Sequence, residues 1–254
     1  MLDMNSVTAP VGVVLSHGFT GGLHSVTPWA DALRSEGFHV VTPLLPGHGT
    51  TWEDLATRSW REWYEACEAA YAEVAAQCSA VVVAGLSMGG ALALRLAALH
   101  PVAGVSVVNP ALVIDDPRSY ISAVMRYAIR SVPAIGNDIK LPGQDERAYL
   151  RVPVAAAHQM KLLFRDTVRL LPRATAPVQI FRSTVDHTVT SERSVGAITR
   201  WYGGSDIRLV RLPNSYHVAT LDNDAETIFT ESAAFVRSVT SARAATPRRT
   251  EEPA

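Results

Sequence analysis

Residues 84–90 read AGLSMGG and place one serine, Ser87, among glycines directly after the apolar run Ser79–Val83. A strand that turns sharply into a helix can hold a serine hydroxyl in the open, but such a turn tolerates little bulk two residues to either side. Gly85 and Gly89 occupy those two positions, and an Ala/Leu-rich helix pattern follows. The G-x-S-x-G pattern alone also fits a tight strand-to-helix turn with an incidental serine. In this context it predicts a nucleophile.

A serine hydroxyl needs a base to take its proton, and the base needs a carboxylate to orient it. Of eight histidines, only His217, in LPNSYHVATLD (212–222), lies between the last predicted strand and the last predicted helix. The alternative for His217 is an ordinary surface histidine. Asp186, in FRSTVDHTV, follows the preceding predicted strand, whereas its neighbour His187 comes too early in the chain to be the base. The candidate triad is Ser87, Asp186 and His217.

Attack on a carbonyl also needs hydrogen-bond donors for the oxyanion that forms. The backbone N–H of Met88, directly after the serine, is one candidate. SHGFTGG (16–22) ends an early predicted strand, and its glycines allow close approach, so the N–H of Phe19 is the second candidate. A plain glycine-rich turn is the alternative for this loop.

The elements that would position these groups alternate along the chain. β-Branched apolar runs predict strands at 11–18, 37–45, 79–85, 102–110, 176–183 and 205–213. Helices are predicted near 25–36, 58–77, 88–99, 191–201 and 223–241. This alternation predicts an α/β fold with a mostly parallel sheet and helices on both faces.

Residues 111–172 interrupt that rhythm. The segment is long, carries several prolines and contains two helical pieces, SYISAVMRYAIR and VAAAHQMKLLFRDTVRLL. We interpret it as an insertion between two sheet strands. It separates a first core part (1–110) from a second (173–241), and the polar tail 242–254 is expected to be disordered.

Composition narrows the class of protein. The chain has 254 residues and a net charge of −1, from 23 basic and 24 acidic residues, so no excess charge indicates nucleic acid or an anionic membrane as partner. Cys67 and Cys78 lie too far apart on one predicted helix to form a disulfide. They fall on an apolar stripe and are expected to be core residues; a reactive thiol is the alternative. No signal peptide or membrane span is predicted, which favours a cytoplasmic protein.

Together, HGFTGG, LLPGHGTT, GLSMGG, VDHTV and RLPNSYHVATLD resemble the bacterial carboxylesterase and monoacylglycerol lipase family of α/β-hydrolases, over nearly the whole chain to about residue 241. The order Ser87, Asp186, His217 is that of α/β-hydrolases. The resemblance implies hydrolysis of carboxylic esters, monoacylglycerols and simple fatty-acid esters among them, through an acyl-enzyme and without metal or cofactor. It implies the same triad and the same oxyanion donors, Phe19 and Met88.

The resemblance also makes 111–172 a small cap over the active site. In IGNDIKLPGQDERAYL (135–150) it implies that Glu146 contacts the glycerol part of a lipid ester and that Ile135 belongs to the pocket wall. The alternative for Glu146 is a solvated residue beside Arg147.

Several functions share these residues. A thioesterase, an acyltransferase or a small-amide hydrolase would use the same triad. An interfacial lipase would dock transiently on lipid through the apolar cap helices. A ligand-binding protein on a hydrolase scaffold is the non-enzymatic alternative, although it predicts a missing triad member. Dehalogenases of this fold are disfavoured because they carry a carboxylate at the position of Ser87.

Overall fold

The computed structural model describes residues 9–114 and 126–244, and its centre is a six-stranded, fully parallel sheet in the order β2-β1-β3-β4-β7-β8. The strands are β1 (Val11–Ser16), β2 (His39–Val41), β3 (Ala80–Leu86), β4 (Gly104–Val108), β7 (Val178–Ser183) and β8 (Ile207–Leu212). All six predicted strands are confirmed. The edge strand β2 is much shorter than the apolar pattern over 37–45 suggested, because it pairs with one neighbour over three residues only.

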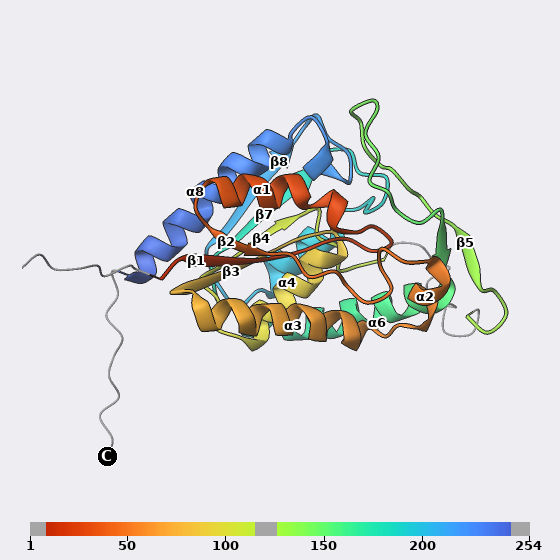
Figure 1. Cartoon of the computed structure of the whole chain (residues 1–254), viewed down its shortest axis with the longest axis horizontal. Helices are drawn as coiled ribbons and strands as arrows, with labels where there is room; N and C mark the ends of the chain where they lie inside the picture. Colours follow the sequence, from red (N-terminus) through yellow and green to blue (C-terminus); the bar gives the residue numbers. More distant parts are fainter. Residues whose placement is uncertain (1–8, 115–125, 245–254) are drawn as a thin grey trace, which may run out of the picture.

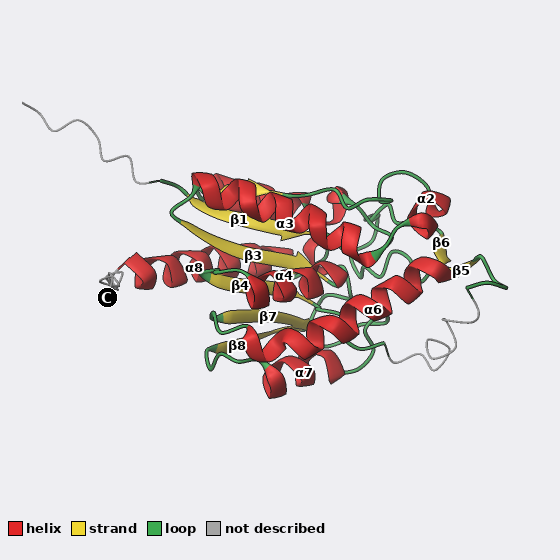
Figure 2. Ribbon diagram, turned by 90° about the horizontal axis from the view of Figure 1, so that it is seen from below, coloured by secondary structure: helices red, strands yellow, loops and turns green. Residues whose placement is uncertain are grey.

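Helices cover both faces of the sheet (Figures 1 and 2). One layer contains α1 (Thr27–Ser35) and α8 (Ala225–Ala244), and the other contains α3 (Trp60–Gln77), α4 (Met88–Leu99), α6 (Val154–Leu170) and α7 (Arg193–Trp201). Helix α8 runs three residues beyond the predicted end at 241, so residues 242–244 are helix rather than tail. The rest of the predicted tail, 245–254, lies outside the described residues. Over the described ranges, no helix is both long and apolar enough to cross a membrane.

The start of α3 and its buried face follow directly from the sequence. Ser59 and Glu62 form a capping box: the Ser59 hydroxyl accepts from the Glu62 N–H at 3.4 Å, and the Glu62 carboxylate accepts from the Ser59 N–H at 2.7 Å. The apolar stripe of this helix consists of Trp60, Tyr64, Cys67, Tyr71, Val74 and Cys78. The first five are buried, and Cys78 is partly buried. Burial raises the pKa of the Cys67 thiol to about 12, so this cysteine is a protonated core residue.

The segment predicted as an insertion has two parts. Its second helical piece is confirmed as α6, which packs on α3 and α4 in one apolar cluster. The first piece was predicted as a helix over 119–130. Residues 126–130 form a turn and irregular chain instead, and the remainder lies outside the described residues. Between the two comes a short antiparallel pair, β5 (Ser131–Pro133) and β6 (Arg151–Pro153), beside the small helix α2 (Trp52–Thr57).

The loop that joins β5 to β6, residues 134–150, is called the strap here. Figures 1 and 2 show β5, β6 and α2 beyond the carboxyl ends of the central strands. In an open parallel sheet, this edge is where ligands bind. The strap therefore lies over the edge where the candidate triad is expected.

Candidate active site

Ser87 lies at the sharp turn between β3 and α4. Its backbone has φ 56° and ψ −117°, which is a strained conformation for a residue with a side chain. A Cβ on Gly85 would lie 2.2 Å from the carbonyl carbon of Gly89, and a Cβ on Gly89 would lie 2.1 Å from the Ser16 carbonyl oxygen. The two glycines are therefore required because strand, helix and neighbouring loop approach within contact distance at the serine.

The strained turn is fixed by its neighbour β4. The Ser87 N–H donates to the Val108 carbonyl at 2.9 Å, and the Ser87 carbonyl accepts from the Ala111 N–H at 3.1 Å. Met88 is the first residue of α4, so its N–H is among the helix donors that have no partner within the helix. Ser87 keeps 9% of its surface exposed. Backbone constraint thus presents the serine at the edge of the sheet.

His217 and Asp186 meet at the same edge, from the loops after β8 and β7. His217 Nδ1 lies 3.0 Å from Asp186 Oδ2, and both residues are buried. The other carboxylate oxygen accepts from the N–H groups of Thr188, at 3.0 Å, and Val189, at 2.7 Å. The aspartate can thus hold the imidazole with Nδ1 as donor, which leaves Nε2 free to act as a base.

The environment of Asp186 keeps it ionised. Burial alone would raise the pKa of this carboxyl. The charge and hydrogen bond of His217, the N–H of Val189 and the charge of Arg182 outweigh burial, and the pKa lies below its usual value. The carboxylate is therefore available to stabilise an imidazolium.

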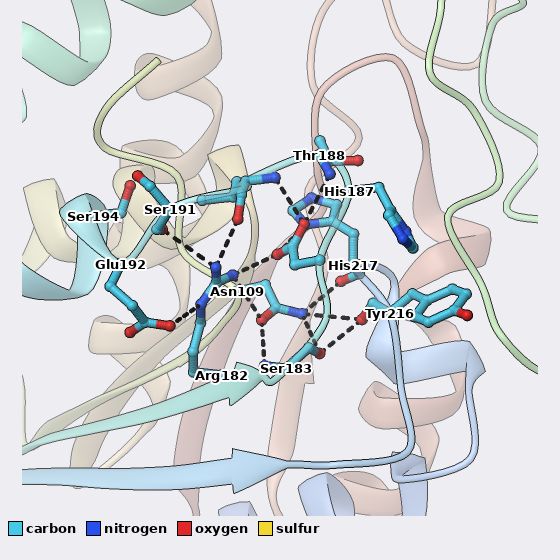
Figure 3. Close-up of polar contacts among 12 residues, drawn as sticks. Asn109, Arg182, Ser183, His187, Thr188, Ser191, Glu192, Ser194, Tyr216 and His217 are labelled. Atoms are coloured by element: carbon cyan, nitrogen blue, oxygen red, sulfur yellow. Dashed lines mark hydrogen bonds and ion pairs between the residues drawn. The ribbon is translucent and has the colours of Figure 1, made fainter. Parts of the chain in front are cut away.

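Asn109 ties the loops of the site together (Figure 3). Its amide nitrogen donates to the carbonyl of His217 at 2.8 Å and to the Ser183 hydroxyl at 3.0 Å. Its amide oxygen accepts from the Ser183 N–H at 2.9 Å. Asn109 is fully buried and has φ 44°, a region that asparagine tolerates better than most residues. One side chain therefore links the ends of β4 and β7 to the histidine loop. The sequence analysis missed it.

The loop after β1 lies against the serine. A Cβ on Gly18 would lie 3.4 Å from the Cβ of Ser87, which places residues 17–19 beside the nucleophile turn. His17 holds this loop: its Nδ1 pairs with the Gly18 carbonyl at 2.9 Å, and its Nε2 accepts from the Leu45 N–H at 3.2 Å. Burial lowers the pKa of His17 to about 4, so the ring is neutral near pH 7. Phe19, the predicted second oxyanion donor, is the next residue after Gly18.

The strap is attached to the triad loops by two buried carboxylates. Asp138 accepts from the N–H of His187 at 2.9 Å and from the N–H of His217 at 3.3 Å. It also pairs with the His187 ring at 2.7 Å. Asp222, beyond the triad histidine, accepts from the strap N–H groups of Lys140 and Leu141 at 2.7 and 2.9 Å. The segment predicted to cover the site is thus bonded to it.

The two predicted substrate contacts differ in setting. Glu146 is half-buried, and its carboxylate accepts from the Asn137 N–H at 2.7 Å. Burial raises the pKa of the Glu146 carboxyl, although the Asn137 N–H and the charge of His217 oppose the rise. The charge of His217 is thus among the groups that act on Glu146. Ile135 is 70% exposed, and its place in a pocket wall stays a prediction.

Arg182 is the second functional residue that the sequence analysis missed. It lies in the fully buried strand β7 and donates from Nη1 to Asp186 Oδ2 at 2.5 Å. A lone charged residue four positions before the predicted aspartate was the signal that could have found it.

A cavity of about 640 Å³ lies at the amino ends of β4 and β7, the opposite edge of the sheet, with His100, Arg173 and Arg208 in its lining. In the parts of the chain that the structure describes, no three His, Cys, Asp or Glu residues are grouped to hold a metal ion.

A parallel sheet with covering helices, a serine on a strained strand-to-helix turn and a His–Asp pair on the loops after the last two strands are the features of an α/β-hydrolase. The chain belongs to the alpha/beta hydrolase family, whose profile matches residues 13–229. A thermostable monoacylglycerol lipase from Bacillus sp. (strain H-257) is 39% identical over 230 residues, or 89% of this chain and 90% of that lipase. A carboxylesterase from Bacillus subtilis (strain 168) is 23% identical over 217 residues, covering 85% of this chain and 88% of the esterase.

Solved structures agree with this assignment. A structure reported for the metagenome-derived lipolytic enzymes LipS and LipT has a TM-score of 0.87 and 37% identity, and the match covers 92% of this chain and 96% of that one. The monoacylglycerol lipase of Paleococcus ferrophilus has a TM-score of 0.76 at 18% identity, over 91% of this chain and 96% of its own. The second likeness concerns the fold alone. The expected fold and family are confirmed.

Proposed function

We propose that this chain hydrolyses carboxylic esters, with monoacylglycerols and simple fatty-acid esters as substrates. The observation that carries the proposal is the 3.0 Å contact between His217 Nδ1 and Asp186 Oδ2, at the sheet edge where Ser87 occupies a strained turn. Relatives named monoacylglycerol lipase and carboxylesterase support the substrate class.

The proposed reaction proceeds through an acyl-enzyme. His217 Nε2 takes the proton of the Ser87 hydroxyl as its oxygen attacks the ester carbonyl carbon. The N–H groups of Phe19 and Met88 stabilise the oxyanion. The imidazolium, stabilised by the ionised Asp186, then gives its proton to the departing alcohol. Water attacks the acyl-enzyme by the same route, which releases the fatty acid and returns the proton to Ser87.

Glu146 is the proposed contact for the alcohol part of the substrate. Its carboxylate is oriented by the Asn137 N–H and lies near His217, the residue that protonates the leaving alcohol. A glycerol leaving group has free hydroxyls that could donate to this carboxylate, whereas a methyl ester has none. This position supports a preference for monoacylglycerols over alkyl esters.

Labelling and turnover test the proposal together. Wild-type protein should react with a fluorophosphonate probe and hydrolyse p-nitrophenyl esters, and Ser87→Ala should do neither while melting at a similar temperature. Ser79→Ala is the matched control, because Ser79 lies just before the opposite end of β3 and its hydroxyl contacts only Ala9 and Pro10. Ester turnover that survives in Ser87→Ala would reject the assignment.

A further inference from the structure

Arg182 is the only charged residue in β7, whose sequence is VQIFRS and whose residues are all buried. Its side chain is 4% exposed. Burying a guanidinium is unfavourable unless its charge is paired and its N–H groups are bonded. The strand therefore carries this charge for its contacts, since an apolar residue would fit the surrounding core more simply.

The guanidinium contacts the start, the middle and the end of the loop that carries the triad aspartate. Nη1 donates to Asp186 Oδ2 at 2.5 Å, and Nη2 donates to the carbonyls of Val189 at 2.6 Å and Ser191 at 3.3 Å. Nε donates to the Glu192 carboxylate at 3.2 Å. Figure 3 shows Arg182 between Ser191 and Glu192 on one side and Asn109 on the other. A planar fork with five donors suits this task, and an ammonium cannot reproduce it.

The contact has an electrostatic consequence because of the atom that it uses. Asp186 Oδ2 accepts from Arg182 and also pairs with His217 Nδ1. The aspartate charge that would stabilise an imidazolium is thus shared with a permanent cation. The oxygen that orients the imidazole is therefore the same oxygen that Arg182 holds in place.

We propose that Arg182 is a positioning residue of the active site, which holds the carboxylate of Asp186 against His217 Nδ1 by bonding the whole length of the loop that carries the aspartate. This inference rests on the proposed ester hydrolysis. It adds a residue that acts through the triad without touching substrate.

Other charged or titratable groups lie around Asp186 and His217. Glu192 comes from the loop before α7, Arg211 from β8, and His187 from the loop after β7 that also carries Asp186. The strap contributes Asp138 and Glu146. Glu192 pairs with both arginines and is 55% exposed, so solvent screens its charge more than that of the guanidinium at Asp186. Removing Arg182 therefore leaves a net gain of negative charge around the imidazole.

Three variants separate charge from geometry. Arg182→Met removes both, Arg182→Gln removes the charge but keeps a donor, and Arg182→Lys keeps the charge but cannot bond all the loop carbonyls at once. The split between kcat and KM on a p-nitrophenyl ester reports how well the His–Asp pair is oriented once substrate is bound. The NMR signal of the proton on His217 Nδ1 reports the bond to Asp186 without turnover. Melting temperatures show which variants fold.

In the uncharged variants, kcat should fall more than about tenfold with little change in KM, and the signal of the His217 Nδ1 proton should move, because the carboxylate is less well oriented. In Arg182→Lys, kcat should fall about tenfold, because the ammonium cannot bond all the loop carbonyls at once. Wild-type kcat and an unmoved Nδ1 proton signal in a folded uncharged variant would overturn the inference. If neither uncharged variant folds, wild-type kcat in Arg182→Lys would overturn it.

The two proposals fail in different ways. Wild-type protein without ester turnover would reject the proposed function, and the NMR signal of the His217 Nδ1 proton would still decide whether Arg182 positions Asp186. Ester turnover in the wild type, with the same kcat and an unmoved Nδ1 proton signal in the uncharged variants, would reject only the role of Arg182.

Discussion

Replacing Asp138 by alanine tests whether the strap helps to build the active site. Asp138 comes from a segment far from the triad in sequence, yet its side chain is only 8% exposed. It accepts from the N–H groups of His187 and His217, the residue after the triad aspartate and the triad histidine itself. The alanine variant leaves both N–H groups without this acceptor and removes the ion pair with the His187 ring.

The expected loss of stability in Asp138→Ala follows from these contacts. A hydrogen bond to a charged group contributes about 1.5–3 kcal/mol. The bond to the His217 N–H is long, at 3.3 Å, and the His187 side chain is 55% exposed, so both contribute at the low end or below. We expect a loss of about 2–3 kcal/mol in the free energy of unfolding. For a domain of this size that corresponds to about 5–10 °C in melting temperature.

Activity should fall as well, because the loosened loops carry both members of the His–Asp pair. A loss of about 1–2 kcal/mol in transition-state stabilisation lowers kcat about 5- to 30-fold. The assay is p-nitrophenyl ester turnover, with thermal unfolding measured on the same samples. Asp145→Ala is the matched control, since Asp145 is an exposed strap residue whose carboxylate accepts only from Arg147. Equal losses in Asp138→Ala and Asp145→Ala, or no loss in either, would refute the reasoning.

Gly89→Ala should lose both fluorophosphonate labelling and soluble yield, because the added Cβ would lie 2.1 Å from the Ser16 carbonyl oxygen. Gly196→Ala is the control in another helix: its added Cβ would meet open space, so this variant should behave as wild type. Burial lowers the pKa of the His48 ring to about 3, against 6.5 in the unfolded chain. The stability that the buried neutral ring contributes is therefore complete above pH 6.5 and is lost as the pH falls toward 3. At pH 5 this loss is about 2 kcal/mol, and His48→Gln should show a correspondingly smaller drop in denaturant midpoint between pH 7 and 5; equal drops would contradict it. Glu146→Gln should raise KM about fivefold for a monoacylglycerol and leave KM for the methyl ester unchanged, since a neutral acceptor binds a hydroxyl about 1 kcal/mol more weakly; parallel changes on both esters would refute a glycerol contact.

The sequence was sufficient for the sheet and for the candidate nucleophile because those signals are local. β-Branched runs predicted all six central strands, and the glycines around Ser87 predicted a turn that the structure shows with φ 56°. The order of Asp186 and His217 after the last two strands is also readable along the chain. Each of these inferences needs only residues within one element and the loop that follows it.

The missed residues depend on contacts between distant segments. Asp138 is 79 positions from His217, and Asn109 is 108 positions from the same histidine. Nothing near either residue indicates which loop it will bond, because the pairing is created by the parallel order of the strands. Arg182 was visible as an isolated charge in an apolar strand, but its partner Asp186 becomes apparent only when the loop folds back over the strand end. The short pair β5–β6 was missed since three-residue strands give almost no pattern.

The contacts of the strap bear on how the site is enclosed. On one side Asp138 and Asp222 bond it to the histidine loop. On the other side the Tyr149 N–H donates to the Thr20 carbonyl at 3.0 Å, and the Tyr149 hydroxyl donates to the Gly47 carbonyl at 2.8 Å. Lifting the strap as a lid would break bonds on both sides and would take the donors of Lys140 and Leu141 away from Asp222. The strap is therefore fixed at the edge of the candidate site, and its bonds reach the three loops that carry His217, Asp186 and Phe19, the candidate oxyanion donor.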